Sequence, residues 1–137
     1  MGRLRRLRLL LDTHVWLWSL LEPARVARRL ARRLEDEANE LWLSPISIWE
    51  ALLLAERGQI EVGIDGEEWV RRALRAMPVR DATLTREVAL ASRSLSLPHE
   101  DPADRFIAAS AIVYELTLVT SDQRLLDSNQ YRTLANG

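Results

Sequence analysis

The sequence predicts an α/β fold with a central parallel sheet of about five strands and helices on both faces. Short apolar runs alternate along the chain with longer helical segments, and this alternation is typical of parallel sheets. Acidic residues lie at the ends of two of the apolar runs, at the strand ends where ligands bind in this class of fold. With 137 residues, 47% of them hydrophobic, the chain is expected to form a single domain, residues 1–137, around one core.

The N-terminal third is expected to hold two strands and two helices. The apolar run 7–11 predicts a buried strand, and the strongly apolar segment 13–21 predicts a short helix after it. Pro23 is expected to restart the chain as a second helix over residues 24–39, because apolar residues recur there every four positions. Residues 41–43 then predict a short second strand.

Helix boundaries are clearest in the middle of the chain. Ser44 and Pro45 predict a helix start, because proline is favoured at the first helical position. That helix is expected to run to about residue 57 and to stop at Gly58, and Asp65 is expected to cap the next one. The remaining expected elements are helices over 65–76, 85–94, 101–115 and 123–127, strands over 78–79 and 116–120, and a small edge strand in the tail.

Composition excludes several classes of protein. No stretch reaches the roughly 18–20 apolar residues that span a bilayer. The basic leader is followed by no small-residue cleavage site, so a secretory signal is not expected. The absence of cysteine excludes disulfides and thiolate metal sites. We therefore expect a cytoplasmic protein without membrane association.

The net charge of −1 does not indicate a nucleic-acid partner, but the basic residues are clustered. All nineteen are arginine, and the clusters at Arg3–Arg8 and Arg25–Arg33 contain no acidic residue. Arginine suits bidentate phosphate contact, and basic clusters are a footprint of nucleic-acid binding. Solvated helix faces and a biased genome composition explain the same pattern, so charge alone leaves both explanations open.

Three acidic residues are placed where this fold tends to build an active site. Asp12 and Asp122 each follow an apolar strand, so right-handed crossovers bring both to one edge of the sheet. Glu50, inside an apolar helix, either points toward them or faces outward beside Ser47. An oxygen-lined pocket of this kind suits Mg²⁺ or Mn²⁺. Each aspartate can instead cap the helix that follows it.

Asp101 and Asp104 form a second acidic feature at an expected helix start. Their spacing of three residues puts both on one helix face. The helix dipole accounts for one acid there, but two acids in the first turn repel each other unless a cation lies nearby. Arg105 can supply that cation, or it can clamp a phosphate.

The polar side chains near these acids carry weaker signals. With only His14 and His99 present, histidine-based zinc chemistry has little support, and packing or surface roles are the simpler explanation for both. Ser47, Thr120 and Ser121 are placed to hydrogen-bond a metal-bound water. No glycine-rich phosphate loop is present, so nucleotide-dependent phosphoryl transfer has no support.

Three tryptophans lie on the same expected helices as the acids. Trp16, Trp18 and Trp49 are able to stack on bases, but their helical spacing beside leucines favours packing in the core or in a dimer.

Taken together, four segments resemble the PIN-domain proteins, and in particular the VapC-type toxins of bacterial toxin–antitoxin pairs. The segments are residues 10–16, 44–50, 99–111 and 118–122. They occur in the family's order, and the resemblance covers nearly the whole chain. The Asp-Pro-x-Asp-Arg block at 101–105 and the Thr-x-Asp element at 120–122 are specific in combination.

The resemblance implies a PIN-like three-layer fold and an endoribonuclease that depends on Mg²⁺ or Mn²⁺. It implies one acidic cluster as catalytic and metal-binding residues: Asp12, Glu50, Asp104 and Asp122. Asp101 and Thr120, with the neighbouring Ser121, are the accessory candidates. Water would attack the phosphodiester and leave a 5′-phosphate and a 3′-hydroxyl.

The resemblance also implies partners. RNA is the expected substrate, a homodimer is the expected assembly, and a small VapB-like antitoxin is the expected inhibitor. An acidic pocket repels RNA, so arginines outside it are expected to hold the strand. The candidates are Arg105, Arg25, Arg28 and Arg29.

Two other classes of function remain open at this level. One is a related metal-dependent phosphatase or DNA nuclease, although the chain is small and has no added DNA-clamping segment. The other is a non-catalytic interaction domain whose acids bind a basic partner. Metal dependence separates the enzymes from the interaction domain.

Overall fold

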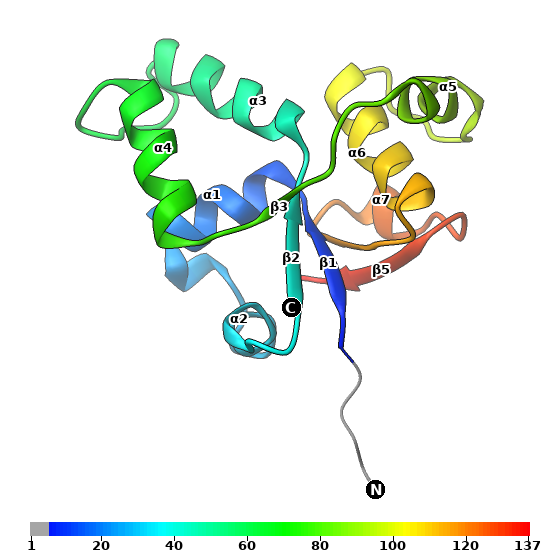
Figure 1. Ribbon diagram of the computed structural model, residues 1–137, viewed down its shortest axis with the longest axis horizontal. Coiled ribbons are helices and arrows are strands. Elements are labelled where there is room, and N and C mark those ends of the chain that lie inside the picture. The colour runs from blue at the N-terminus through cyan, green and yellow to red at the C-terminus, as the bar shows by residue number, and fades with distance from the viewer. Residues whose placement is uncertain (1–5) are drawn as a thin grey trace, which may run out of the picture.

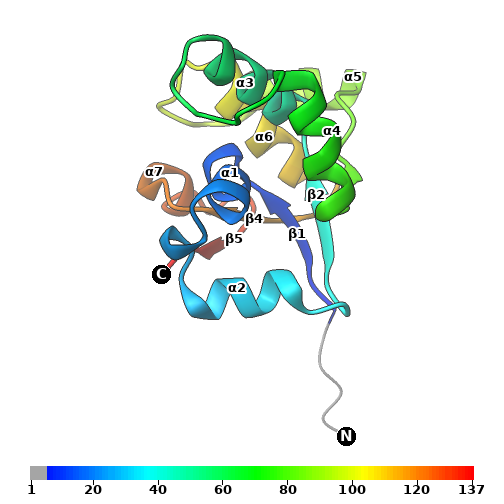
Figure 2. The ribbon, with the colours of Figure 1, turned by 90° about the vertical axis from the view of Figure 1, so that its left-hand side faces the viewer.

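The computed structural model describes residues 6–137 and contains a five-stranded sheet with helices on both sides (Figures 1 and 2). The strand order is β3-β2-β1-β4-β5 and every pair is parallel, which confirms the predicted α/β class. The strands are β1 (Arg8–Leu11), β2 (Glu40–Leu43), β3 (Arg80–Asp81), β4 (Thr117–Thr120) and β5 (Arg132–Ala135). The helices are α1 (Thr13–Leu21), η1 (Pro23–Arg25), α2 (Arg28–Glu35), α3 (Pro45–Glu56), α4 (Gly66–Ala76), α5 (Arg86–Ser94), α6 (Pro102–Val113) and α7 (Gln123–Leu126).

The central strand β1 is buried on both faces. Leu9 and Leu11 pack into one apolar cluster with residues of α1, α2 and α3. Leu10, between them, packs into a second cluster with residues of α5 and α6. Successive side chains of a strand point to opposite faces, so an unbroken apolar run is what a strand between two helix layers requires.

Two predicted elements are wrong in their extent. The helix expected over 24–39 is divided into η1 and the shorter α2, because Val26 adopts an extended backbone and the amide of Ala27 donates to the side chain of Asn136. The strand expected at 78–79 lies instead at β3, where it pairs with the end of β2. Both differences come from contacts between segments distant in sequence, which local periodicity does not encode.

Helices begin directly after several of the strands, at the same edge of the sheet. Asp12 follows β1 and caps α1, Ser44 follows β2 and caps α3, and Asp122 follows β4 and caps α7. The amide of Asp12 donates to the carbonyl of Val119 at 2.9 Å, so the ends of β1 and β4 are in contact. This edge is therefore where side chains from separate segments meet.

Candidate active site

The four predicted acids come from four separate segments of the chain and line one cavity. It has a volume of about 320 Å³, and we call it the acidic cavity. Its lining residues are Asp12, His14, Trp18, Glu50, Asp101, Asp104, Ser121 and Asp122. The structure thus brings together the four expected catalytic acids and two of the three accessory candidates.

Asp12 is the buried acid of the site, with only 8% of its surface exposed. Its Oδ1 accepts from the backbone N–H of Thr13 at 2.8 Å, and its Oδ2 accepts from Thr120 Oγ1 at 2.7 Å. Burial raises the pKa of the Asp12 carboxyl, against the lowering effect of these hydrogen bonds. Capping and cavity lining, which the sequence presented as alternatives, are combined in one side chain.

Glu50 points inward from α3. Its Oε1 accepts a short hydrogen bond from Thr13 Oγ1, which also lies 2.7 Å from Ser47 Oγ. Because the single Thr13 hydroxyl proton goes to Glu50, Ser47 is the donor to Thr13. Burial raises the pKa of Glu50, and the charges of Asp101 and Asp12 raise it further.

Asp104 is an acid whose pKa is strongly raised. Burial, together with the nearby charges of Asp12 and Asp101, raises the pKa of Asp104 to about 6. Asp101 caps α6 by accepting from the backbone N–H of Ala103 at 3.1 Å. The expected repulsion between the two acids is therefore present, and Arg105 does not neutralise it.

Asp122 differs from the other acids because donors surround it. Its Oδ1 accepts from the backbone N–H of Arg124, and its Oδ2 accepts from Nε2 of His99, each at 2.9 Å. Although burial acts to raise it, the pKa of Asp122 is lowered overall by the hydrogen bonds from His99 and Arg124. His99 was expected to have only a packing or surface role, and its position in the 99–111 motif was the available signal.

The donor set suits a hard divalent cation. The cavity offers carboxylate oxygens, which Mg²⁺ and Mn²⁺ prefer, and its described lining contains no arginine or lysine. Among residues 6–137, no group of three or more His, Cys, Asp or Glu side chains is arranged to hold a metal ion as it stands. The acids face one space from its walls, and the pKa values of Asp12, Glu50 and Asp104 are raised, mainly by burial and further by the charges of neighbouring acids.

Arg105 does not act as the phosphate clamp that the sequence suggested. Its side chain is buried, and its guanidinium donates to four backbone carbonyls, one in the last turn of α5 and three on the segment between α5 and α6. The acceptors are Ser92, Leu95, Leu97 and His99. The guanidinium therefore holds the loop before α6, and because it is buried it is not accessible to RNA.

The other arginine candidates lie on the surface. Arg25 places its guanidinium 4.2 Å from the ring centroid of Trp18, which lines the acidic cavity. Arg28 and Arg29 are exposed at the start of α2. Of the N-terminal cluster, Arg3 and Arg5 lie outside the described residues, whereas Arg6 and Arg8 pair with Glu40.

The three tryptophans take different positions. Trp16 is wholly buried in the core, which excludes it from base stacking, while Trp49 is 55% exposed on α3. Only Trp18 lines the acidic cavity.

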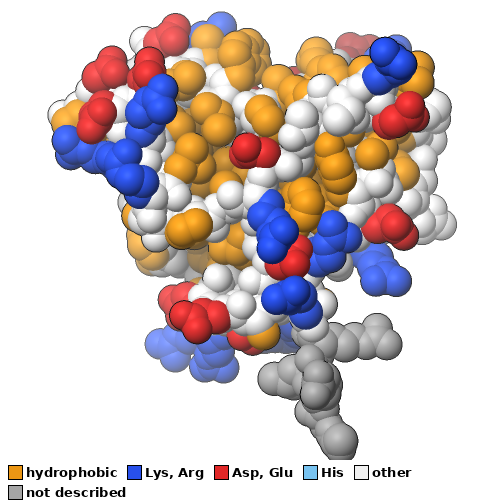
Figure 3. Space-filling model, in the orientation of Figure 1, with side chains coloured by type: hydrophobic (Ala, Val, Ile, Leu, Met, Phe, Trp, Pro, Cys, Tyr) orange, Lys and Arg blue, Asp and Glu red, His pale blue; other side chains and the backbone are white. Residues whose placement is uncertain are grey.

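On the face drawn in Figure 3, acidic and basic side chains are intermixed around apolar ones, so no uniform basic field covers the described part of that face.

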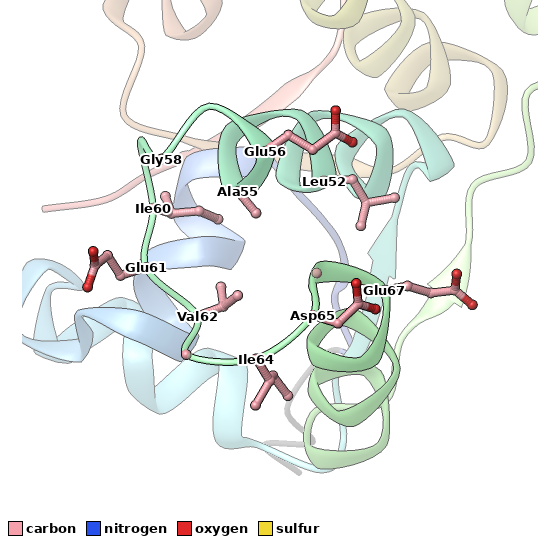
Figure 4. A pocket seen from close by; sticks show the side chains of 12 residues that line it. Leu52, Ala55, Glu56, Gly58, Ile60, Glu61, Val62, Ile64, Asp65 and Glu67 are labelled. Atoms are coloured by element: carbon pink, nitrogen blue, oxygen red, sulfur yellow. The ribbon is translucent and has the colours of Figure 1, made fainter.

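A larger hollow of about 730 Å³ lies between α3 and α4. Leu52, Ala55, Ile60 and Val62 point into it, and Glu56 and Glu61 point away (Figure 4). Four acids are among its lining residues, but they come from one continuous segment of the chain, whereas carboxylates from four separate segments meet at the smaller acidic cavity, which is therefore the better candidate. None of the helices in residues 6–137 is long and apolar enough to cross a membrane.

Comparisons with known proteins agree with this geometry. The family model described as PIN domain matches residues 9–129. Ribonuclease VapC22 of Mycobacterium tuberculosis is 39% identical over 119 residues, which cover 85% of this chain and 88% of that protein. Two solved structures have a TM-score of 0.67: VapBC2 from Rickettsia felis bound to a promoter DNA fragment, at 14% identity, and DNA-bound VapBC from Salmonella typhimurium, at 15%. They cover 94% and 96% of this chain, and 98% and 99% of those chains, and at such identities they show a shared fold alone.

Proposed function

The chain belongs to the PIN-domain family, and from this premise we propose that it is a metal-dependent endoribonuclease toxin of the VapC type, neutralised by a VapB-like antitoxin. The observation that carries the proposal is the acidic cavity, in which Asp12, Glu50 and Asp104 lie together with raised pKa values. The 39% identity to a ribonuclease supports the same activity.

We assign the binding of the ion to the four carboxylates of Asp12, Glu50, Asp104 and Asp122. When bound, Mg²⁺ or Mn²⁺ would lower the pKa of a water molecule and compensate negative charge on the phosphate oxygens. Thr120 and Thr13 hold the carboxylates of Asp12 and Glu50 by hydrogen bonds. Thr120 thereby acts as an accessory residue that orients an acid.

The cavity also offers a proton acceptor. General bases in proteins are often carboxylates. We assign a lining carboxylate that does not itself bind the ion to accept a proton from the attacking water. Attack by water leaves a 5′-phosphate and a 3′-hydroxyl on the two RNA fragments.

The proposed setting follows from the same family membership. We take residues 1–137 as one catalytic domain that acts on RNA in the cytoplasm as a homodimer. The structural neighbours are complexes named VapBC, which supports a small antitoxin as partner.

The test is cleavage of total cellular RNA by antitoxin-free protein in the presence of Mn²⁺, with the 5′ ends of the products mapped. Discrete fragments with 5′-phosphates, lost with EDTA and in Asp104→Asn, are expected. DNA of the mapped sequence, single- and double-stranded, runs in parallel. Cleavage of DNA but not RNA would favour the DNA-nuclease alternative, and no cleavage by folded, Mn²⁺-loaded protein would favour a non-catalytic interaction domain.

A further inference from the structure

Aromatic side chains extend from the acidic cavity along α1. His14 and Trp18 are one helical turn apart and both line the cavity, with their ring centroids separated by 6.0 Å and their planes tilted by 49°. The guanidinium of Arg25 lies over the ring of Trp18 and is not part of the cavity lining. These three residues, which we call the α1 strip, therefore run from the cavity to the surface beside it.

The outer end of the α1 strip is held in place by Asn136. The Asn136 side chain donates to the carbonyl of Arg25 at 3.0 Å and accepts from the N–H of Ala27 at 2.8 Å. Its backbone N–H donates to the carbonyl of Thr120 at 3.2 Å, and the Thr120 hydroxyl donates to Asp12. The same framework thus fixes Arg25 and a catalytic acid relative to each other.

Arg25 is free to exchange its present partner for a ligand. It pairs with Glu22 at 3.3 Å, and the two side chains are 56% and 57% exposed. Exposed ion pairs of this kind contribute little to stability, so replacing the carboxylate with a phosphate costs little. The stacking on Trp18 keeps the planar guanidinium at the end of the strip while its edge remains able to bind an anion.

This combination fits single-stranded RNA. Proteins recognise unpaired bases by stacking them on aromatic rings and arginine planes, and arginine binds phosphate through paired N–H groups. The acidic cavity itself repels the phosphate backbone, so the strand needs attachment beside the cavity.

On the basis of this geometry we propose that the α1 strip binds the nucleotide that flanks the scissile phosphate. The base of that nucleotide packs against the rings of His14 and Trp18, and its outer phosphate binds Arg25. The inference rests on the proposed ribonuclease function and adds to it the place where the substrate is held.

The first experiment measures RNA affinity in an Asp104→Asn background, where the substrate stays intact. Fluorescence anisotropy with an oligoribonucleotide that spans a mapped cleavage site gives the Kd. Trp18→Leu, which keeps an apolar side chain at a half-buried position, is expected to raise the Kd about tenfold, and Trp18→Phe to restore most of the affinity. Trp49→Leu, on an exposed tryptophan of α3 outside the cavity, is the matched control and is expected to leave the Kd unchanged.

The second experiment separates stacking from phosphate binding. Replacing the flanking nucleotide with an abasic one is expected to weaken binding by the Asp104→Asn protein. The same replacement is expected to have little effect on its Trp18→Leu derivative, because that variant has already lost the aromatic ring that the base contacts. Arg25→Ala is expected to lower the slope of log affinity against log salt concentration by about one. Arg71→Ala, which removes another exposed arginine paired with a glutamate, is expected to leave that slope unchanged.

The outcomes distinguish the two proposals. Wild-type protein that cleaves no RNA overturns the ribonuclease function and the α1 strip with it. Wild-type cleavage together with equal Kd values for the Trp18→Leu and Trp49→Leu variants overturns the α1 strip alone. Variants that weaken antitoxin binding and not RNA binding would reassign the α1 strip to a protein partner.

Discussion

His99 and Asp122 are joined by a hydrogen bond of 2.9 Å between Nε2 and Oδ2, and the His99 side chain is only 1% exposed. The backbone carbonyl of His99 in turn accepts from the buried guanidinium of Arg105. The first contact joins residues that are 23 positions apart in sequence. Together they connect the loop before α6 to an acid at the end of β4, so the position of Asp122 depends on residues that do not line the acidic cavity.

The histidine is expected to orient Asp122 for metal binding. Groups that hydrogen-bond a metal-binding carboxylate affect metal affinity by about 10–100-fold. His99→Leu should therefore weaken Mn²⁺ binding, measured by isothermal titration calorimetry, by at least about tenfold. His99→Gln keeps an N–H donor and should recover part of the affinity. Equal Mn²⁺ affinity in the wild-type and His99→Leu proteins would show that His99 only fills space.

Arg105 is expected to be essential for stability and not for RNA contact. Lysine keeps the positive charge but cannot reach four carbonyls with one ammonium group, so Arg105→Lys should lower the free energy of unfolding by about 2–3 kcal/mol. Urea unfolding provides the measurement, and the exposed Arg93→Lys is the control. If Arg105 bound phosphate instead, Arg105→Lys would leave stability unchanged and weaken RNA binding.

The Thr120 hydroxyl is expected to connect two of the acids. It donates to Asp12 and accepts from the backbone N–H of Asp122. Thr120→Val preserves the shape of the side chain and removes both hydrogen bonds, so the pKa of Asp12 should rise further and Mn²⁺ affinity should fall about tenfold. Thr120→Ser should restore binding. Thr117→Val, at the other end of β4, is the control, and a similar loss there would contradict the assignment.

Removing one charge from the acidic cavity is expected to stabilise the ion-free protein. The Asp104 carboxyl has a pKa of about 6 in the folded chain against 3.8 for an ordinary solvated aspartate, so the folded state holds the proton more tightly and stability falls as pH rises between those values. Asp104→Asn should abolish this fall. After allowance for solvent screening of a half-buried group, the gain above pH 6 should be about 1 kcal/mol.

The measurement for Asp104 is urea unfolding of both proteins from pH 3.5 to pH 8 in EDTA. The two free energies of unfolding should agree near the acidic limit, diverge up to about pH 6 and then differ by a constant amount. Mn²⁺ should reverse the order by stabilising the wild-type protein alone. If the difference in the free energy of unfolding did not change with pH, the pKa of Asp104 would not be raised in the folded protein.

Local sequence determined most of the elements and part of the site. The largely apolar runs that precede Asp12 and Asp122 predict buried strands, and the capping residues Ser44 and Asp65 mark helix starts where the structure has them. These features depend on near neighbours in the chain, so periodicity and capping chemistry suffice to find them. The parallel arrangement then follows from the alternation of strands and helices, and it implies that strand-end acids meet.

Only the tertiary structure decided which side chains near the acids serve which purpose. Trp16 and Trp18 look alike in sequence, yet one is core and the other lines the acidic cavity. Arg105 follows an acidic motif but turns inward to carbonyls, while Arg25, far from that motif, lies over Trp18. The physical reason is that burial and hydrogen-bond partners are set by segments brought together from across the chain, as Asn136 does for Arg25 and Thr120 for Asp12.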